Sequence, residues 1–216
     1  MDADFWKTVW EEGKTGFHQG TYHEKLLQYF PHLNASRGQN IFVPLCGKTK
    51  DMYWLHEQGL IVRGIELHGP AIQAFFEENK LPLPKISMDE NYLNYNAGNI
   101  TISCGDFFKV AEENFFDFVY DRASLVALPE IMRKEYAKVI TKVTKKGGKC
   151  LLIGYEYNST ELEGPPFSVT EKEIRSLYEK NFSVKLLERE RPKGEAGRLS
   201  AAHSLNQTVY LMEKLS

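Results

Sequence analysis

Residues 41–66, IFVPLCGKTKDMYWLHEQGLIVRGIE, decide the fold of this chain. The apolar run 41–43 is typical of a buried strand, residues 48–58 have the spacing of a helix that Gly59 ends, and residues 61–66 indicate a second strand. Strands that alternate with helices in this way pair in parallel. The stretch therefore predicts an α/β fold built on a parallel sheet.

The same alternation continues along the chain. The patterns predict helix 69–79, strand 100–104, strand 116–120, helix 129–143, strand 149–155 after a Gly147-Gly148 turn, and helix 170–180. The polar loop 80–98 is long enough to hold a small additional structure. Strands 182–190 and 207–213 have no helix between them, so we expect them to form an antiparallel hairpin. A seven-stranded, mainly parallel sheet with helices on both faces and such a C-terminal hairpin resembles the Rossmann-like class I methyltransferase fold.

The chain reads as one domain. Its 216 residues are 42% hydrophobic, and no repeat, linker or low-complexity segment interrupts them. Trp6 and Trp10 lie at helical spacing before Gly13, which ends the pattern. We therefore expect a single domain over residues 1–216, with 1–30 as an N-terminal lid region whose aromatic side chains cover a ligand. Plain core packing is the alternative for these aromatics.

Charge and cysteine content limit the partners and the compartment. The 27 lysines and arginines against 29 acids give a net charge of −2, which argues against wrapping a nucleic-acid backbone. Cys46, Cys104 and Cys150 are an odd number, widely spaced, and fit a reducing compartment. No apolar run approaches the ~18 residues of a membrane span, and no basic start followed by an apolar stretch opens the chain. We expect a cytoplasmic protein.

The turn after the first strand lacks the common nucleotide signatures. Phe42 stands where a phosphate loop requires glycine, and the turn supplies only Gly47 where a dinucleotide site needs several glycines. Cys46 is interpreted as a buried, unreactive thiol, because it lacks the preceding glycine of a nucleophile elbow. His18 and His23 lack the spacing of a metal site and are expected to face solvent.

Charged residues stand at the end of three predicted strands or directly after it, where sheets of this class bind ligands. Glu66 ends strand 61–66, where an acid accepts both ribose hydroxyls of a bound nucleoside. Gly105 and Asp106 follow strand 100–104, and Asp121 and Arg122 follow strand 116–120. Each has a simpler alternative: a solvated charge for Glu66, a helix cap for Asp106, and an ion pair for Asp121 with Arg122.

Five blocks of sequence, in this order, resemble the thiopurine S-methyltransferase family: Trp6-x-x-x-Trp10-x-x-Gly13-Lys-Thr-Gly-Phe17-His18-Gln19, Val43-Pro-Leu-Cys-Gly-Lys48 with Asp51-Met52 and Trp54-Leu55, Gly64-Ile-Glu66, Asp121-Arg122-Ala-Ser-Leu-Val-Ala-Leu-Pro129 with Met132-Arg133 and Tyr136, and Gly164-Pro-Pro-Phe167. The resemblance implies S-adenosyl-L-methionine as methyl donor and S-adenosyl-L-homocysteine as product. It also implies a thiopurine or another small aromatic thiol, or a selenium or tellurium compound, as acceptor.

The resemblance implies roles for individual residues. The donor site falls on Trp6, Trp10, Phe17, Leu45, Glu66, Gly105, Asp106 and Arg122. Phe17 and Arg198 are the acceptor-side candidates, and residues 190–206 depart from the family pattern. Arg122 is the candidate catalytic residue, because an arginine favours the thiolate form of an attacking thiol and Asp121 can orient its guanidinium. Methyl transfer from a sulfonium releases a neutral leaving group, so we expect no metal.

Other functions remain open at this point. A halide or aliphatic-thiol methyltransferase would share the donor site, and a non-catalytic S-adenosylmethionine-binding module would keep Glu66 and the aromatic lid. Pro165-Pro166-Phe167 is similar to a motif of nucleic-acid amino-methyltransferases, but it follows the fifth predicted strand instead of the fourth. We expect a monomer that acts on a small molecule, with no nucleic-acid or membrane partner.

Overall fold

The computed structural model describes residues 3–16, 18–192 and 197–215. They form two compact units, Met1–Ala111 and Glu112–Ser216. The single domain over 1–216 stays a prediction. No helix of the described ranges is both long enough and apolar enough to cross a bilayer.

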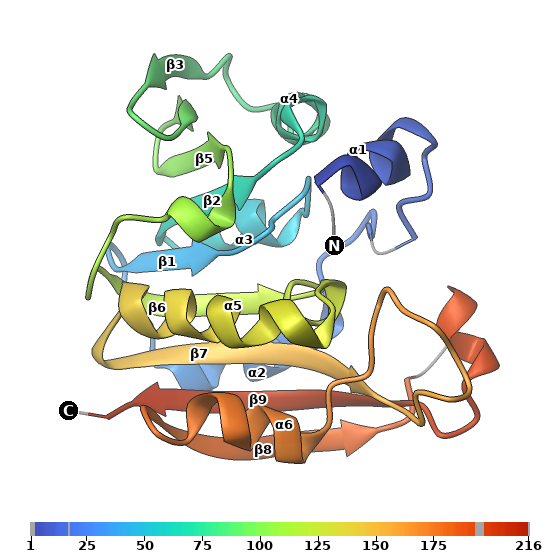
Figure 1. Cartoon of the computed structure of the whole chain (residues 1–216). Coiled ribbons are helices and arrows are strands. Elements are labelled where there is room, and N and C mark those ends of the chain that lie inside the picture. Colours follow the sequence, from blue (N-terminus) through green and yellow to red (C-terminus); the bar gives the residue numbers. More distant parts are fainter. Residues whose placement is uncertain (1–2, 17, 193–196, 216) are drawn as a thin grey trace. The chain divides into compact units, whose positions relative to one another are not determined.

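The first unit is a mixed sheet with helices (Figure 1). Its helices are α1 (Ala3–Glu11), α2 (Glu24–Tyr29), α3 (Asp51–Glu57) and α4 (Gly69–Glu78), with short 3-10 turns η1 (Phe30–Leu33) and η2 (Phe107–Lys109). Its strands are β1 (Asn40–Val43), β2 (Ile61–Glu66), β3 (Lys85–Met88), β4 (Leu93–Ala97) and β5 (Ile100–Cys104), in the order β3-β4-β5-β2-β1. The predicted strands 41–43, 61–66 and 100–104 are confirmed as β1, β2 and β5.

The parallel strands of this unit bring their carboxyl ends to one edge. Val43 of β1 pairs with Gly64 of β2, and Glu66 of β2 pairs with Cys104 of β5. Helices α3 and α4 pack against β2 and β5. Apolar side chains of these helices, such as Met52 of α3 and Phe75 of α4, are fully buried. The chain segments that leave β1, β2 and β5 therefore start beside one another.

The segment 80–98 holds more than the sequence predicts. Strands β3 and β4 form an antiparallel hairpin that extends the sheet from β5, so the chain has two strands more than expected. All four residues of β3 are exposed, so no alternation of apolar and polar side chains marks the strand. Polar pairs fix β4 instead: Asn96 Nδ2 donates to Thr101 Oγ1 at 2.8 Å, and Ser103 Oγ donates to Asn94 Oδ1 at 2.6 Å.

The second unit is also built from strands and helices (Figure 1). Its elements are β6 (Phe116–Arg122), η3 (Leu125–Ala127), α5 (Glu130–Val143), β7 (Thr144–Glu156), α6 (Glu171–Tyr178), β8 (Phe182–Glu190), η4 (Gly197–Ala201) and β9 (Asn206–Lys214). The strand order is β6-β7-β9-β8. Strands β6 and β7 are parallel, whereas β9 is antiparallel to both β7 and β8. The expected C-terminal hairpin is confirmed, with β9 inserted between β7 and β8.

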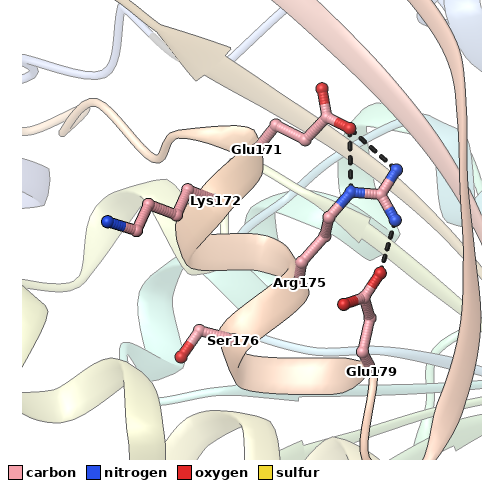
Figure 2. A pocket seen from close by; sticks show the side chains of 5 residues that line it. All are labelled: Glu171, Lys172, Arg175, Ser176 and Glu179. Carbon is pink, nitrogen blue, oxygen red and sulfur yellow. Dashed lines mark hydrogen bonds and ion pairs between the residues drawn. The ribbon is translucent and has the colours of Figure 1, made fainter.

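The outer face of α6 forms a shallow hollow that ion pairs fill (Figure 2). Arg175 lies between Glu171 and Glu179, one helical turn away on either side. Arg189 of β8 also reaches Glu171, at 2.7 Å. Because both acids of this hollow are paired with arginines at an exposed surface, it has the character of a solvated helix face and offers little to a ligand.

We predict that Gly64→Ala destabilises the first unit. A Cβ at this position would lie 2.7 Å from Cys46 Sγ and 2.9 Å from Met52 Sδ, both of them buried. Such overpacking costs roughly 1–3 kcal/mol in the free energy of unfolding, measured by urea denaturation. Gly20→Ala is the matched control, since a Cβ there meets nothing within 4 Å. Equal stability of the two variants would contradict this account of the β1–β2 packing.

Candidate functional site

The turn after β1 folds back onto the end of β2. Leu45 has φ 44° and Gly47 has φ 53°, so two left-handed residues reverse the chain within four positions. The Cys46 N–H donates to the carbonyl of Ile65 at 2.9 Å. The Cys46 side chain is buried, and burial, reinforced by nearby Glu66, raises the pKa of its thiol well above the ordinary value. The interpretation of Cys46 as a buried thiol is confirmed.

The Glu66 carboxylate is the centre of this edge. Glu66 is the last residue of β2, and it is only 7% exposed. The Gly47 N–H donates to Oε2 at 2.8 Å, and the His68 N–H donates to Oε1 at 2.7 Å. Burial raises the pKa of Glu66, and backbone N–H groups of His68, Gly47 and Leu67 oppose that rise. The alternative of a solvated surface charge is therefore wrong.

The bonding of Glu66 leaves it able to bind a ligand. A carboxylate has about four acceptor positions on its two oxygens, and two backbone N–H groups fill only part of them. The remaining positions suit a pair of hydroxyl donors. A buried acid that keeps acceptor capacity at the carboxyl end of a parallel strand is the arrangement that a ribose requires.

Trp10 brings the N-terminal segment to the same edge. Its ring lies parallel to the His68 imidazole, with the centroids 5.8 Å apart. A Cβ on Gly47 would stand 3.1 Å from Trp10 Cζ2, so the indole packs directly over the turn. Trp6 is half-buried one helical turn earlier and contacts Phe5 edge-to-face. Phe17, predicted for both donor and acceptor, lies outside the described residues.

Gly105 and Asp106 follow β5 at this edge. The Gly105 N–H donates to the Glu66 carbonyl at 3.0 Å, and a Cβ on Gly105 would lie 2.7 Å from the Tyr92 ring. Exposed Asp106 caps η2, since its Oδ1 accepts from the Phe108 N–H at 2.9 Å. The other carboxylate oxygen leaves a ligand role open. Tyr92 is missed by the sequence analysis, which places it in the polar loop 80–98 and predicts for that loop only a small additional structure.

The two histidines differ from the expectation that both face solvent. His23 is only 3% exposed, and its imidazole caps α2 by accepting from the Lys25 N–H at 3.2 Å. His18 is half-buried, with Nε2 3.7 Å from a Glu78 carboxylate oxygen that α4 supplies. The prediction is wrong because both imidazoles have polar partners within the protein, a backbone N–H for His23 and the Glu78 carboxylate for His18.

In the second unit, Arg122 is the last residue of β6 and is half-buried. Ala123, which follows it, has φ 60°, so the chain turns sharply there. Asp121 is buried, and its carboxylate accepts from the Leu125 N–H at 3.2 Å and from the Tyr136 hydroxyl at 2.8 Å. We expected either an exposed ion pair of Asp121 with Arg122 or an Asp121 carboxylate that orients the Arg122 guanidinium. Both expectations are wrong, because the Asp121 oxygens bond the following turn and Tyr136 of α5.

Arg198 holds a neighbouring loop of the same unit. Its Nη2 donates to the Glu163 carbonyl at 2.7 Å, and its Nη1 to the Pro165 carbonyl at 3.2 Å. The Tyr157 hydroxyl donates to the Pro166 carbonyl at 2.6 Å. The guanidinium therefore braces the loop that carries the Pro-Pro motif. A contact of Arg198 with an acceptor stays a prediction.

Solved structures with a similar backbone share the fold. The 1,6-didemethyltoxoflavin-N1-methyltransferase of Burkholderia thailandensis matches with a TM-score of 0.66 at 14% identity, covering 99% of this chain and 87% of that one. An S-adenosylmethionine-dependent methyltransferase from Methanosarcina mazei matches with a TM-score of 0.65 at 16% identity, covering 86% of this chain and 97% of that one. The expected class I methyltransferase fold is confirmed.

Comparison of the sequence with known proteins identifies the family to which the chain belongs. The family model of thiopurine S-methyltransferase matches residues 1–215. A thiopurine S-methyltransferase of Bordetella pertussis is 43% identical over 191 residues, which are 88% of this chain and 87% of that protein. The resemblance carried by the five sequence blocks is confirmed, and the chain belongs to the thiopurine S-methyltransferase family.

Proposed function

We propose that this protein transfers a methyl group from S-adenosyl-L-methionine to the sulfur of a thiopurine or another small aromatic thiol. The observation that carries the proposal is the buried Glu66 carboxylate, held by the N–H groups of Gly47 and His68 under Trp10. Membership of the thiopurine S-methyltransferase family supplies the acceptor class. Selenium and tellurium compounds are the next acceptors to consider.

The residues at this edge fit the donor. Glu66 offers acceptor positions to two ribose hydroxyls, and Trp10 and His68 offer parallel ring faces beside it. An aromatic face suits a sulfonium cation, because the ring quadrupole attracts positive charge. Leu45 is half-buried and left-handed in the turn after β1, and Gly105 and Asp106 follow β5. We assign these three residues, with Trp6, to the donor site on their positions.

The reaction needs little acid or base chemistry from the protein. Bound S-adenosyl-L-methionine supplies a methyl group on a sulfonium, and the leaving thioether is neutral. The protein residues therefore position the donor and keep water from the attacking sulfur, which accounts for a large part of such rate enhancements. Neither a metal ion nor a general acid has a step to perform in this scheme.

Arg122 is the candidate for favouring the thiolate of the acceptor. Its guanidinium stays charged at every working pH, so it lowers the pKa of a neighbouring thiol without titrating itself. We propose this role from its position at the carboxyl end of β6 and from the family motif that it belongs to. Phe17 and Arg198 remain candidates for the acceptor side.

A product assay on a panel of acceptors tests the proposed function. The panel contains 6-mercaptopurine, an aryl thiol, an alkyl thiol, selenite, tellurite and iodide, each with S-adenosyl-L-methionine. We expect methylation of the two aromatic thiols at the highest kcat/KM. Turnover of iodide or the alkyl thiol alone would reassign the acceptor class, and donor binding without any product would indicate a non-catalytic module.

Glu66→Gln is expected to weaken donor binding roughly 10- to 100-fold, since hydrogen bonds to a charged group contribute about 1.5–3 kcal/mol. Calorimetry with S-adenosyl-L-homocysteine measures the change. The control is Glu77→Gln, which removes an exposed acid from nearby α4 and should leave the affinity unchanged. If Glu66→Gln binds as tightly as the native protein, the ribose does not lie on this carboxylate.

Ligand binding is expected to order the N-terminal lid. Backbone hydrogen exchange in α1 should slow when S-adenosyl-L-homocysteine is added, because Trp10 then packs between the turn and the ligand. Exchange in α6, whose outer face carries surface ion pairs, serves as the internal control and should not change. Equal protection of α1 with and without ligand would refute the lid.

Arg122→Ala is expected to shift the rate against pH toward higher pH, because the acceptor thiol regains its solution pKa. Arg122→Lys keeps the charge and loses the planar fork, so it should lie between the alanine variant and the native protein. Rates are measured with 6-mercaptopurine under saturating donor. A curve that keeps its midpoint and only scales down would show that the thiolate is stabilised elsewhere, with Arg198 the next residue to test.

A further inference from the structure

Asp121 and Tyr136 form a buried, hydrogen-bonded pair. Asp121 directly precedes Arg122, the candidate catalytic residue. Asp121 is 1% exposed and Tyr136 has no exposed surface. The tyrosine hydroxyl, from α5, donates to Asp121 Oδ2 at 2.8 Å. A buried charge is costly unless hydrogen bonds compensate it, so the residues around this carboxylate bear directly on its protonation state.

The second oxygen of Asp121 organises the turn that follows Arg122. Its Oδ1 accepts from the Leu125 N–H at 3.2 Å, and the Ser124 N–H also bonds the carboxylate. Ala123 is held at φ 60°, a conformation that a residue with a side chain seldom adopts without compensation. The ionised carboxylate thus stabilises a strained turn that begins immediately after Arg122.

Other contacts within the second unit fix the far end of this turn. The Phe167 N–H donates to the Val126 carbonyl at 2.6 Å, and Arg133 Nε donates to the Leu128 carbonyl at 2.8 Å. These bonds hold residues 126–128, whereas the first part of the turn is held by the Asp121 carboxylate and by the Ser124 hydroxyl, which donates to the Arg122 carbonyl at 3.4 Å. The direction in which Arg122 leaves β6 therefore depends on Asp121.

We propose that Tyr136 and Asp121 are positioning residues for methyl transfer: the tyrosine hydroxyl keeps the aspartate ionised and fixed on the turn 123–125, and the turn in turn fixes Arg122. This inference rests on the proposed function, because it needs Arg122 to act in the reaction. It assigns no contact with donor or acceptor to either residue.

The pKa of Asp121 links the Asp121–Tyr136 pair to the pH dependence of activity. Tyr136 from α5, Tyr178 from α6 and Cys150 from β7 interact with the carboxylate, and Arg122 is its neighbour in sequence. Burial raises the pKa of Asp121 to about 6, and the bonds from Tyr136, Leu125 and Ser124 oppose that rise. Protonation would remove the charge that holds the turn, so activity should fall as the pH drops through this pKa.

The deciding experiment compares two buried tyrosines. Tyr136→Phe removes the hydroxyl that bonds Asp121, whereas Tyr178→Phe removes a buried hydroxyl for which the described residues provide no hydrogen-bond partner. The dependence of kcat on pH is measured with 6-mercaptopurine at saturating donor, and donor affinity by calorimetry. For Tyr136→Phe we expect the acid-side midpoint to rise by about one pH unit and kcat at pH 7 to fall about twofold, with unchanged donor affinity.

The controls separate positioning from general stability. Tyr178→Phe should keep the native midpoint and kcat. A Tyr136→Phe protein that is folded by circular dichroism and keeps the native midpoint would overturn the proposal, as would an equal shift in Tyr178→Phe. Asp121→Asn gives a second route if Tyr136→Phe fails to fold: kcat should be low and the midpoint near pH 6 absent, which leaves only the titration of the acceptor thiol, and a native profile would overturn the proposal.

The native protein supplies a further check. A profile without an acid-side midpoint near the pKa of Asp121 would refute the inference even if methylation is fast. Absence of any methylation by the native protein would instead refute the proposed function. The two failures are therefore distinguishable.

Discussion

The Glu66 carboxylate, pinned by the backbone N–H groups of Gly47 and His68, is the interaction on which the first unit depends. The bond from Gly47 fixes the turn after β1, and the bond from His68 fixes the chain as it leaves β2. Trp10 then packs on both of these segments. The acid thus joins a strand end to a left-handed turn, Trp10 of the N-terminal helix packs on the segments that the acid fixes, and the remaining acceptor positions of the carboxylate suit a ribose.

In the second unit, too, a buried acid at a strand end holds the neighbouring segments by hydrogen bonds. Asp121 is buried where the strand ends, and its two oxygens bond a backbone N–H of the following turn and a hydroxyl from α5. Burial of Glu66 and of Asp121 removes each carboxylate from water, which costs free energy and raises its pKa. Hydrogen bonds from nearby donors offset part of that cost. The buried acids therefore define the shape of the strand ends, where sheets of this class bind ligands.

The sequence could predict the strands with short apolar runs and the acids that follow them. It could not predict β3, because all its side chains are exposed and backbone pairing alone defines it. It placed Glu66 correctly at a strand end, but the bond from Gly47 depends on two left-handed residues that no local pattern encodes. It misjudged Asp121, because a partner fifteen positions away on α5 decides where that carboxylate points. Contacts between distant elements are the part that composition and periodicity leave out.

The most direct measurement is a crystal structure of this protein with S-adenosyl-L-homocysteine bound. If Glu66 holds the donor, both ribose hydroxyls will lie at about 2.5–3.0 Å from its carboxylate oxygens, with the Gly47 and His68 bonds retained. A ribose bound elsewhere, with the Glu66 carboxylate still bonded only to these two backbone groups, would contradict the account.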